Sequence, residues 1–107
     1  MSLIPQMSVQ ELKQRIDAGN APFVLDVREP FEYQIANLGA RLIPMNEVPA
    51  RLGEIPRDRE VVVQCKSGGR SQRVAEFLVQ SGYTRVANLS GGILAWASEI
   101  DPTMQKY

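Results

Sequence analysis

The sequence contains no histidine and only one cysteine, Cys65. Without an imidazole, Ser-His and Cys-His catalytic pairs and histidine-ligated metal sites are excluded. With a single cysteine, an intramolecular disulfide, a cysteine-rich zinc site and a CxxC redox pair are excluded as well. We therefore expect no metal and no cofactor, and covalent chemistry at sulfur depends on one thiol.

A net charge and a long apolar run are also absent. Twelve basic and twelve acidic residues cancel, so no global field favours nucleic acid or an anionic membrane. No apolar run approaches the roughly 20 residues that span a bilayer. The N-terminus has neither the basic start nor the apolar stretch of a signal peptide. We therefore expect a protein of the reducing cytoplasm, without nucleic-acid or membrane partners.

The features that are present predict one α/β domain. The 107 residues fit a single compact domain, with a core at about residues 4–100 and a polar tail over residues 101–107. Apolar runs at 23–27, 61–65 and 86–89 alternate with segments of helical spacing, which is typical of a mostly parallel sheet. Three consecutive valines make the run at 61–65 the best candidate for the central strand.

Local signals predict where the helices begin and what they bury. Ser8 and Glu11 have the spacing of a capping box at a helix start. The apolar spacing predicts that this helix buries Val9, Leu12 and Ile16. Asn46 is expected to cap a short helix that contains Val48 and Leu52. Two further helices are expected over 70–82 and 93–100.

The segment that follows the central strand carries the predicted chemistry. It reads Cys65, Lys66, Ser67, Gly68, Gly69, Arg70, Ser71. Ligands of parallel sheets bind beyond the carboxyl ends of the strands, where this cysteine is expected. Adjacent glycines let successive amides point into one concavity, and the helix that follows adds its positive end. With two cations nearby, these groups are predicted to stabilise the Cys65 thiolate without a separate base.

A thiolate without a second cysteine can attack phosphorus, a disulfide or the outer sulfur of a sulfur donor. The loop 65–71 resembles the active-site loop of rhodanese-homology domains, which cradles a persulfide. In related cell-cycle and tyrosine phosphatases five residues separate the cysteine from the arginine, whereas four separate Cys65 from Arg70. The shorter loop favours sulfur over phosphate.

Other segments are similar to signatures of the same family, in the same order: Asp26-Val27-Arg28 with Glu32-Tyr33, Leu42-Ile43-Pro44, and Gly91-Gly92-Ile93 with Trp96. The loop and the tail from Ile100 to Tyr107 are similar to the C-terminal rhodanese domain of adenylyltransferases. Those enzymes activate ubiquitin-like sulfur carriers for molybdopterin and thiamine synthesis. The resemblance implies a rhodanese-like α/β fold, with a mostly parallel sheet of about five strands and helices on both faces.

The resemblance also implies sulfur transfer by double displacement. Cys65 would take sulfur from thiosulfate or a protein persulfide, and the amides of residues 66–70 would hold the resulting persulfide. A thiophilic or protein acceptor, such as a ubiquitin-like sulfur carrier, would then remove it. Lys66 and Arg70 are expected to attract an anionic donor, and the Arg70 guanidinium is expected to tie loop carbonyls together as a fork.

Several of these residues can also have a purely structural role. Asp26 and Arg28 are interpreted as an ion pair that orders the loop, with substrate contact as the alternative. Ser71 either caps a helix or donates its hydroxyl to the Cys65 sulfur. Trp96 and the glycines at 91–92 are assigned to the core and a turn. For the whole chain, a Cys-dependent phosphatase or arsenate reductase and a non-catalytic binding module remain alternatives.

Overall fold

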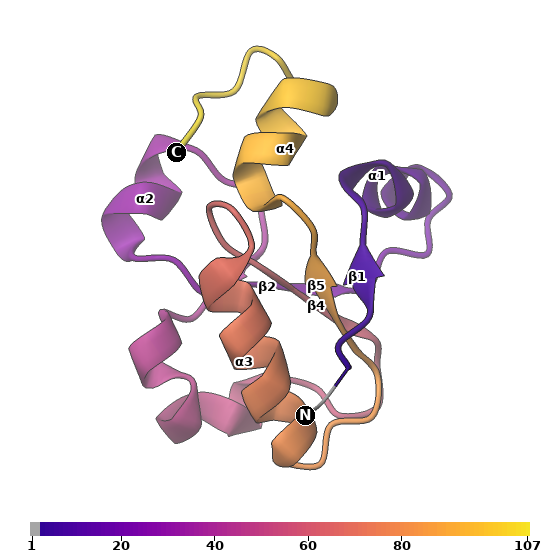
Figure 1. The fold of residues 1–107 in the computed structure, drawn as a ribbon, viewed down its shortest axis with the longest axis vertical. Coiled ribbons are helices and arrows are strands. Elements are labelled where there is room, and N and C mark those ends of the chain that lie inside the picture. Colours follow the sequence, from indigo (N-terminus) through magenta and orange to yellow (C-terminus); the bar gives the residue numbers. More distant parts are fainter. Residues whose placement is uncertain (1–2) are drawn as a thin grey trace.

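A single five-stranded sheet organises the computed structural model, which describes residues 3–107 (Figure 1). The first two residues of the predicted domain, Met1 and Ser2, lie outside that range. The strands follow the order β1-β5-β4-β2-β3, and every paired neighbour is parallel. Their bounds are β1 Gln6–Met7, β2 Phe23–Asp26, β3 Arg41–Leu42, β4 Val61–Gln64 and β5 Val86–Leu89. The α/β class, the number of strands and the central position of the valine strand are confirmed.

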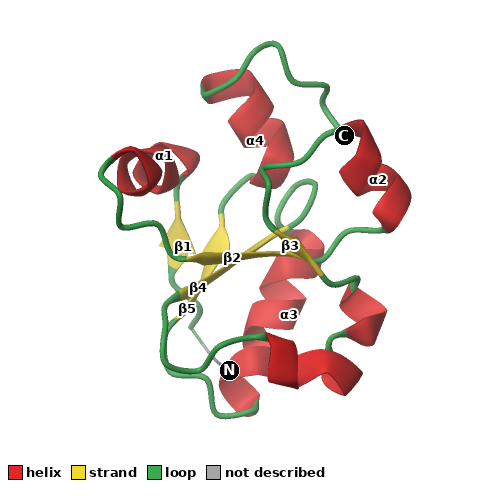
Figure 2. Cartoon of the chain, turned by 180° about the vertical axis from the view of Figure 1, so that it is seen from behind, coloured by secondary structure: helices red, strands yellow, loops and turns green. Residues whose placement is uncertain are grey.

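Helices cover both faces of this sheet, as Figure 2 shows from behind. On one face lie α1 (Val9–Asp17) and α4 (Gly92–Glu99), which contact each other. On the opposite face lie α3 (Gly69–Gln80) and the 3-10 segments η1 (Met45–Glu47) and η2 (Pro49–Glu54). The short helix α2 (Pro30–Ile35) follows β2, and the C-terminus lies beside it (Figure 1).

The alternation of side chains along β4 decides which way the cysteine points. All four strand residues are buried, which explains the continuous apolar run in the sequence. Val61, Val63 and Cys65 belong to the apolar cluster beneath α3, whereas Val62 belongs to the cluster beneath α1 and α4. Full burial of one valine side chain contributes about 1.5–3 kcal/mol. The strand is therefore held firmly, and Cys65 faces α3.

The structure corrects two local predictions. In α1, Val9 and Leu12 are buried, but Ile16 is 42 % exposed. It lies in the last turn, at the rim of a surface hollow instead of against the sheet. Asn46 does not cap a helix, because it lies inside η1, which begins after Pro44. The Ser8 half of the capping box is present, since Ser8 Oγ accepts a hydrogen bond from Glu11 N at 3.1 Å.

The sequence predicts a polar tail after α4, but two of its residues make apolar contacts with the domain. Met104 packs against the apolar cluster beneath α1 and α4. The Tyr107 ring meets the ring of Phe31 on α2 edge to face, with centroids 5.9 Å apart. The tail therefore folds back over the domain. Within residues 3–107, no helix has both the length and the apolar character needed to cross a membrane.

Candidate functional site

The Cys65 sulfur lies directly after β4, at the floor of the loop that leads into α3. Its side chain is 1 % exposed. Gly68 N lies 3.1 Å and Ser71 N 3.4 Å from Sγ, and both amides donate to it. The Ser71 hydroxyl lies 3.3 Å from the same sulfur. Two backbone amides and one hydroxyl, from residues 68 and 71, thus converge on one atom.

Gly68 makes this convergence possible. Its φ of +113° is a conformation that residues with a side chain rarely adopt, and it forms the N-cap of α3. The chain can therefore turn sharply enough for Gly68 N to face back toward Cys65. Because Gly68 is the cap, the capping role considered for Ser71 does not apply, and the hydroxyl contact with Cys65 is the one present.

The surroundings of Cys65 act on its pKa in opposite directions. Burial raises the pKa, whereas hydrogen bonds from the Ser71 hydroxyl and from the backbone amides of Ser71, Gly68 and Ser67 lower it, and the net shift is downward. The N-terminal end of α3 adds positive potential at the same place. The loop therefore favours a thiolate without a neighbouring base.

The first turn of α4 holds the loop from outside. Ile93 N donates to Cys65 O at 3.0 Å, and Leu94 N donates to Lys66 O at 3.1 Å. The carbonyls are thereby turned away from the sulfur. The close approach of α4 to the loop requires a glycine at position 92, because a Cβ on Gly92 would lie 2.4 Å from Cys65 O. The turn predicted for residues 91–92 did not indicate this support. The available signal was that the Gly-Gly pair at 68–69 is repeated at 91–92.

The two cations of the loop have partners from distant segments. Arg70 pairs with both carboxylate oxygens of Glu32 on α2, at 2.8 and 2.9 Å. The expectation that Arg70 ties loop carbonyls together is wrong, because its guanidinium forks onto this carboxylate. Lys66 Nζ lies 4.8 Å from the centroid of the Tyr107 ring. Glu32 was quoted only as part of a signature, although its capping-box spacing from Glu29 marks the start of α2.

The expected ion pair between Asp26 and Arg28 is present and fully buried. Arg28 Nη2 lies 2.8 Å from Asp26 Oδ2 and also donates to Ala36 O at 2.7 Å. A further donor of the same guanidinium reaches Glu32 O at 3.4 Å. Arg28 therefore joins the end of β2 to the backbone of α2 at Glu32 and to its C-cap, Ala36, and so helps to hold Glu32 beside Arg70.

A known family has the same arrangement of elements and loop. Residues 8–99 match the family model described as the rhodanese-like domain. This chain belongs to the rhodanese-like domain family. The match includes the loop 65–71 and every helix from α1 to α4. The resemblance seen in the sequence is confirmed.

Relatives of this rhodanese-like domain include a protein named sulfurtransferase from Allochromatium vinosum. It is 40 % identical over 96 residues, which are 89 % of this chain and 90 % of the relative. MoeZ of Mycobacterium tuberculosis, named as a probable adenylyltransferase/sulfurtransferase, is 36 % identical over 101 residues, or 92 % of this chain but 26 % of MoeZ. The chain thus spans about a quarter of that relative.

A solved structure of similar fold is a rhodanese-like domain protein from Staphylococcus aureus. It has a TM-score of 0.83 and 27 % sequence identity, and the match covers 97 % of this chain and 99 % of that one. The family and the relatives named sulfurtransferase together support sulfur transfer as the general chemistry of this rhodanese-like domain.

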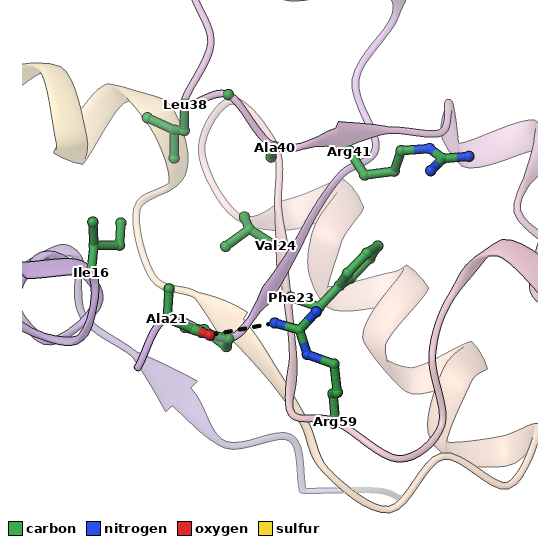
Figure 3. Close-up of a pocket in the computed structure, with 10 residues that line it drawn as sticks. Ile16, Ala21, Phe23, Val24, Leu38, Ala40, Arg41 and Arg59 are labelled. Carbon is green, nitrogen blue, oxygen red and sulfur yellow. Dashed lines mark hydrogen bonds between the residues drawn. The ribbon is translucent and has the colours of Figure 1, made fainter. Parts of the chain in front are cut away.

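The rhodanese-like domain also has a hollow of about 420 Å³ at the amino ends of β2 and β3 (Figure 3). Arg59 reaches across it toward Ala21 O, 3.5 Å away, and lies over the Phe23 ring. Aliphatic side chains such as Ile16 and Leu38 form its rim. None of the described residues that line it is a cysteine, serine, threonine or acidic residue. Cys65 lies at the carboxyl ends of the strands instead.

The Glu32–Arg70 pair is expected to stabilise the rhodanese-like domain at neutral pH. The hydrogen bond from Arg70 holds the pKa of Glu32 below its ordinary value. Stability from this shift is therefore fully present above the unfolded pKa of about 4.3 and is lost as the pH falls through the lower folded pKa. We expect Glu32→Gln to lower the free energy of unfolding by about 1 kcal/mol at neutral pH and by little in acid, as measured by urea unfolding.

A matched control for this prediction is Glu47→Gln. Glu47 pairs with Arg51 within the η1–η2 segment, and its side chain is 55 % exposed. Solvent screening should make the loss of this pair smaller than the loss of the Glu32 pair. Equal destabilisation by the two variants, or an effect of Glu32→Gln that does not decline in acid, would contradict the role given to the Arg70 contact.

Proposed function

We propose that this chain is a rhodanese-type sulfurtransferase that carries sulfane sulfur as a persulfide on Cys65. The observation that carries the proposal is the convergence of Gly68 N, Ser71 N and the Ser71 hydroxyl on one buried thiol. Amides that donate to one buried sulfur stabilise its anionic form, and the sequence has no histidine to act as a general base. The relative named sulfurtransferase supports the same chemistry.

In the proposed loading step, the Cys65 thiolate attacks the outer sulfur of a donor such as thiosulfate. One S–S bond forms at Cys65 while the S–S bond of the donor breaks, and sulfite leaves with the bonding electron pair. The negative charge then lies on the outer sulfur of the Cys65 persulfide. The loop amides are directed there before the reaction, so little reorganisation is needed.

In the proposed unloading step, a nucleophilic acceptor attacks the outer sulfur. The Cys65 thiolate leaves with the bonding electrons, and the donors at Gly68 and Ser71 stabilise the anion that returns. No net oxidation occurs in the protein, which agrees with a single cysteine that has no resolving partner. Lys66 would draw anionic donors toward the loop; Arg70 contributes less because Glu32 offsets its charge.

The donor and acceptor classes are also part of the proposal. Thiosulfate and a protein persulfide both present an outer sulfur to attack. MoeZ combines the name adenylyltransferase with sulfurtransferase, which supports a protein acceptor such as a ubiquitin-like sulfur carrier. A thiol nucleophile works where it is kept reduced, so we propose the cytoplasm as the compartment.

The test of this proposal is a covalent mark on the protein. Incubation with thiosulfate should add the mass of one sulfur atom, and a reducing thiol should remove it. A peptide map should place the added sulfur on Cys65, and Cys65→Ser should remain unmodified. Absence of the adduct, or its location elsewhere, would contradict the proposal. Hydrolysis of an aryl phosphate instead would support the phosphatase alternative.

A further inference from the structure

The Ser71 hydroxyl contacts two groups but has only one proton to donate. One neighbour is the Cys65 sulfur, at 3.3 Å. The other is the side-chain oxygen of Asn88 on β5, to which the hydroxyl is hydrogen bonded. Ser71 is fully buried and Asn88 nearly so, which limits the supply of other partners from water. The direction of the hydroxyl proton is therefore a choice between these two acceptors.

The orientation of the Asn88 amide decides that choice in the resting structure. Asn88 Nδ2 donates to Gly68 O at 3.3 Å and to Gln6 Oε1 at 3.0 Å. Because a backbone carbonyl can only accept, the nitrogen must face Gly68, and the amide oxygen must face Ser71. An amide oxygen also only accepts, so the Ser71 hydroxyl is the donor in its contact with Asn88.

The loop amides favour a thiolate, but a Ser71 hydroxyl that donates to Asn88 suits a Cys65 thiol better. A thiol can donate its own proton to Ser71 Oγ, so that sulfur, hydroxyl and amide are all satisfied. A thiolate needs the hydroxyl proton for itself. If Ser71 turns toward the sulfur, the buried oxygen of Asn88 loses its donor, and a buried acceptor without a partner costs free energy.

We propose that Asn88 is a positioning residue that competes with the Cys65 sulfur for the single proton of the Ser71 hydroxyl. In the persulfide, which rests on the proposed function, the charge moves to the outer sulfur. The inner sulfur then no longer needs the hydroxyl, and Ser71 donates to Asn88 again. Asn88 therefore favours the loaded protein over the free thiolate and acts against the activation that the loop amides provide.

Charged groups around Cys65 do not change when Asn88 is replaced by an apolar residue. Arg70 interacts with Cys65 electrostatically and is paired with Glu32 from α2. Lys66 adjoins the cysteine, and Asp26 and Arg28 form their own buried pair. Strand β5 has no charged residue, and Glu99, the acidic residue of α4, is hydrogen bonded to Gln10 on α1. Farther along α3 lie Arg73 and Glu76.

The test is the pH dependence of Cys65 alkylation by iodoacetamide, a neutral reagent. We expect Asn88→Leu to lower the apparent pKa of Cys65 by about one unit, which corresponds to about 1.4 kcal/mol. In a Ser71→Ala background the same substitution should have no such lowering effect. The comparison removes any contribution from the lost Asn88–Gly68 hydrogen bond, because that bond is lost in both backgrounds.

Gln6→Ala is the matched control. It removes the partner at the nitrogen end of Asn88 and leaves the oxygen end unchanged. Gln6 is exposed, so water can replace its side chain. We expect no change in the Cys65 titration. A shift as large as that of Asn88→Leu would show that general loosening of the network, instead of competition for the proton, controls the thiol.

An equal effect of Asn88→Leu with and without the Ser71 hydroxyl would overturn the proposal, as would no effect in either background. If Asn88→Leu does not fold, Asn88→Asp is used in its place. This substitution keeps the shape of the side chain and makes it a stronger hydrogen-bond acceptor. It should raise the pKa of Cys65, and the rise should be smaller in Ser71→Ala. Alkylation needs no sulfur donor, so this result does not depend on whether Cys65 forms a persulfide.

Discussion

Cys65→Ser is expected to reduce thiosulfate-to-cyanide sulfur transfer by at least about 10⁴-fold, to the background of the assay. A serine hydroxyl is a weak nucleophile at neutral pH, and it cannot hold sulfane sulfur. Cys65 is the only cysteine, so no other residue can take over its role. The measurement is the rate of thiocyanate formation, under conditions where the wild-type rate is proportional to the enzyme concentration.

The same variant should keep its fold. The exchange of sulfur for oxygen is nearly isosteric, and the loop amides that face Cys65 can donate to a hydroxyl as well. We expect a change in unfolding free energy of about 1 kcal/mol, checked by thermal unfolding. Wild-type protein alkylated at Cys65 should lose transfer to the same extent. Activity above a few per cent of wild type in the folded serine variant would end the persulfide mechanism.

Gly92→Ala is expected to damage both stability and transfer, although residue 92 is not part of the loop. Its added Cβ would lie 2.4 Å from Cys65 O and 2.6 Å from Lys66 O. Both atoms are backbone, so the loop and α4 must separate, and the hydrogen bonds from Ile93 and Leu94 weaken. We expect a loss of about 2–4 kcal/mol in unfolding free energy and a fall in kcat.

Gly19→Ala is the control that separates the effect of the steric clash at residue 92 from the effect of its backbone conformation. Gly19 also has a positive φ, of +79°, but its added Cβ meets nothing within 4 Å. It should cost only the left-handed conformation, about 1–2 kcal/mol, with no change in sulfur transfer. Urea unfolding and the thiocyanate assay on both variants provide the comparison. If Gly92→Ala lost no more activity than Gly19→Ala, α4 would not be what supports the loop.

Cys65→Ser and Gly92→Ala change different parts of the same site. In the proposed reaction Cys65 supplies the reacting atom, and its hydrogen-bond donors come from the loop and the first turn of α3. These donors face the sulfur because α4 turns the carbonyls of Cys65 and Lys66 outward. The groups that lower the pKa of Cys65 are the Ser71 hydroxyl and the backbone amides of Ser71, Gly68 and Ser67, none of which carries a full charge. Side-chain charges contribute less, since Glu32 already offsets Arg70.

The α/β class, the central strand and the position of Cys65 at the end of that strand could be predicted from local sequence signals alone. Three valines before Cys65 and two glycines after it act within a few residues, where apolar spacing and backbone freedom dictate strand, turn and helix. The Ser8 contact in α1 was predictable for the same reason. Ile16 was misjudged because helical spacing marks an apolar face but does not show where the sheet beneath it ends.

The groups that surround the thiol could be identified only in the folded protein. Glu32 reaches Arg70 across 38 residues of sequence, and Asn88 reaches Ser71 across 17. Polar side chains such as these have many possible partners, so their spacing along the chain does not select one. The parallel sheet brings their elements to one edge, and burial then requires each donor to find an acceptor there. Local sequence signals therefore located Cys65 and its loop, whereas packing around that edge selected the side chains that lie against them.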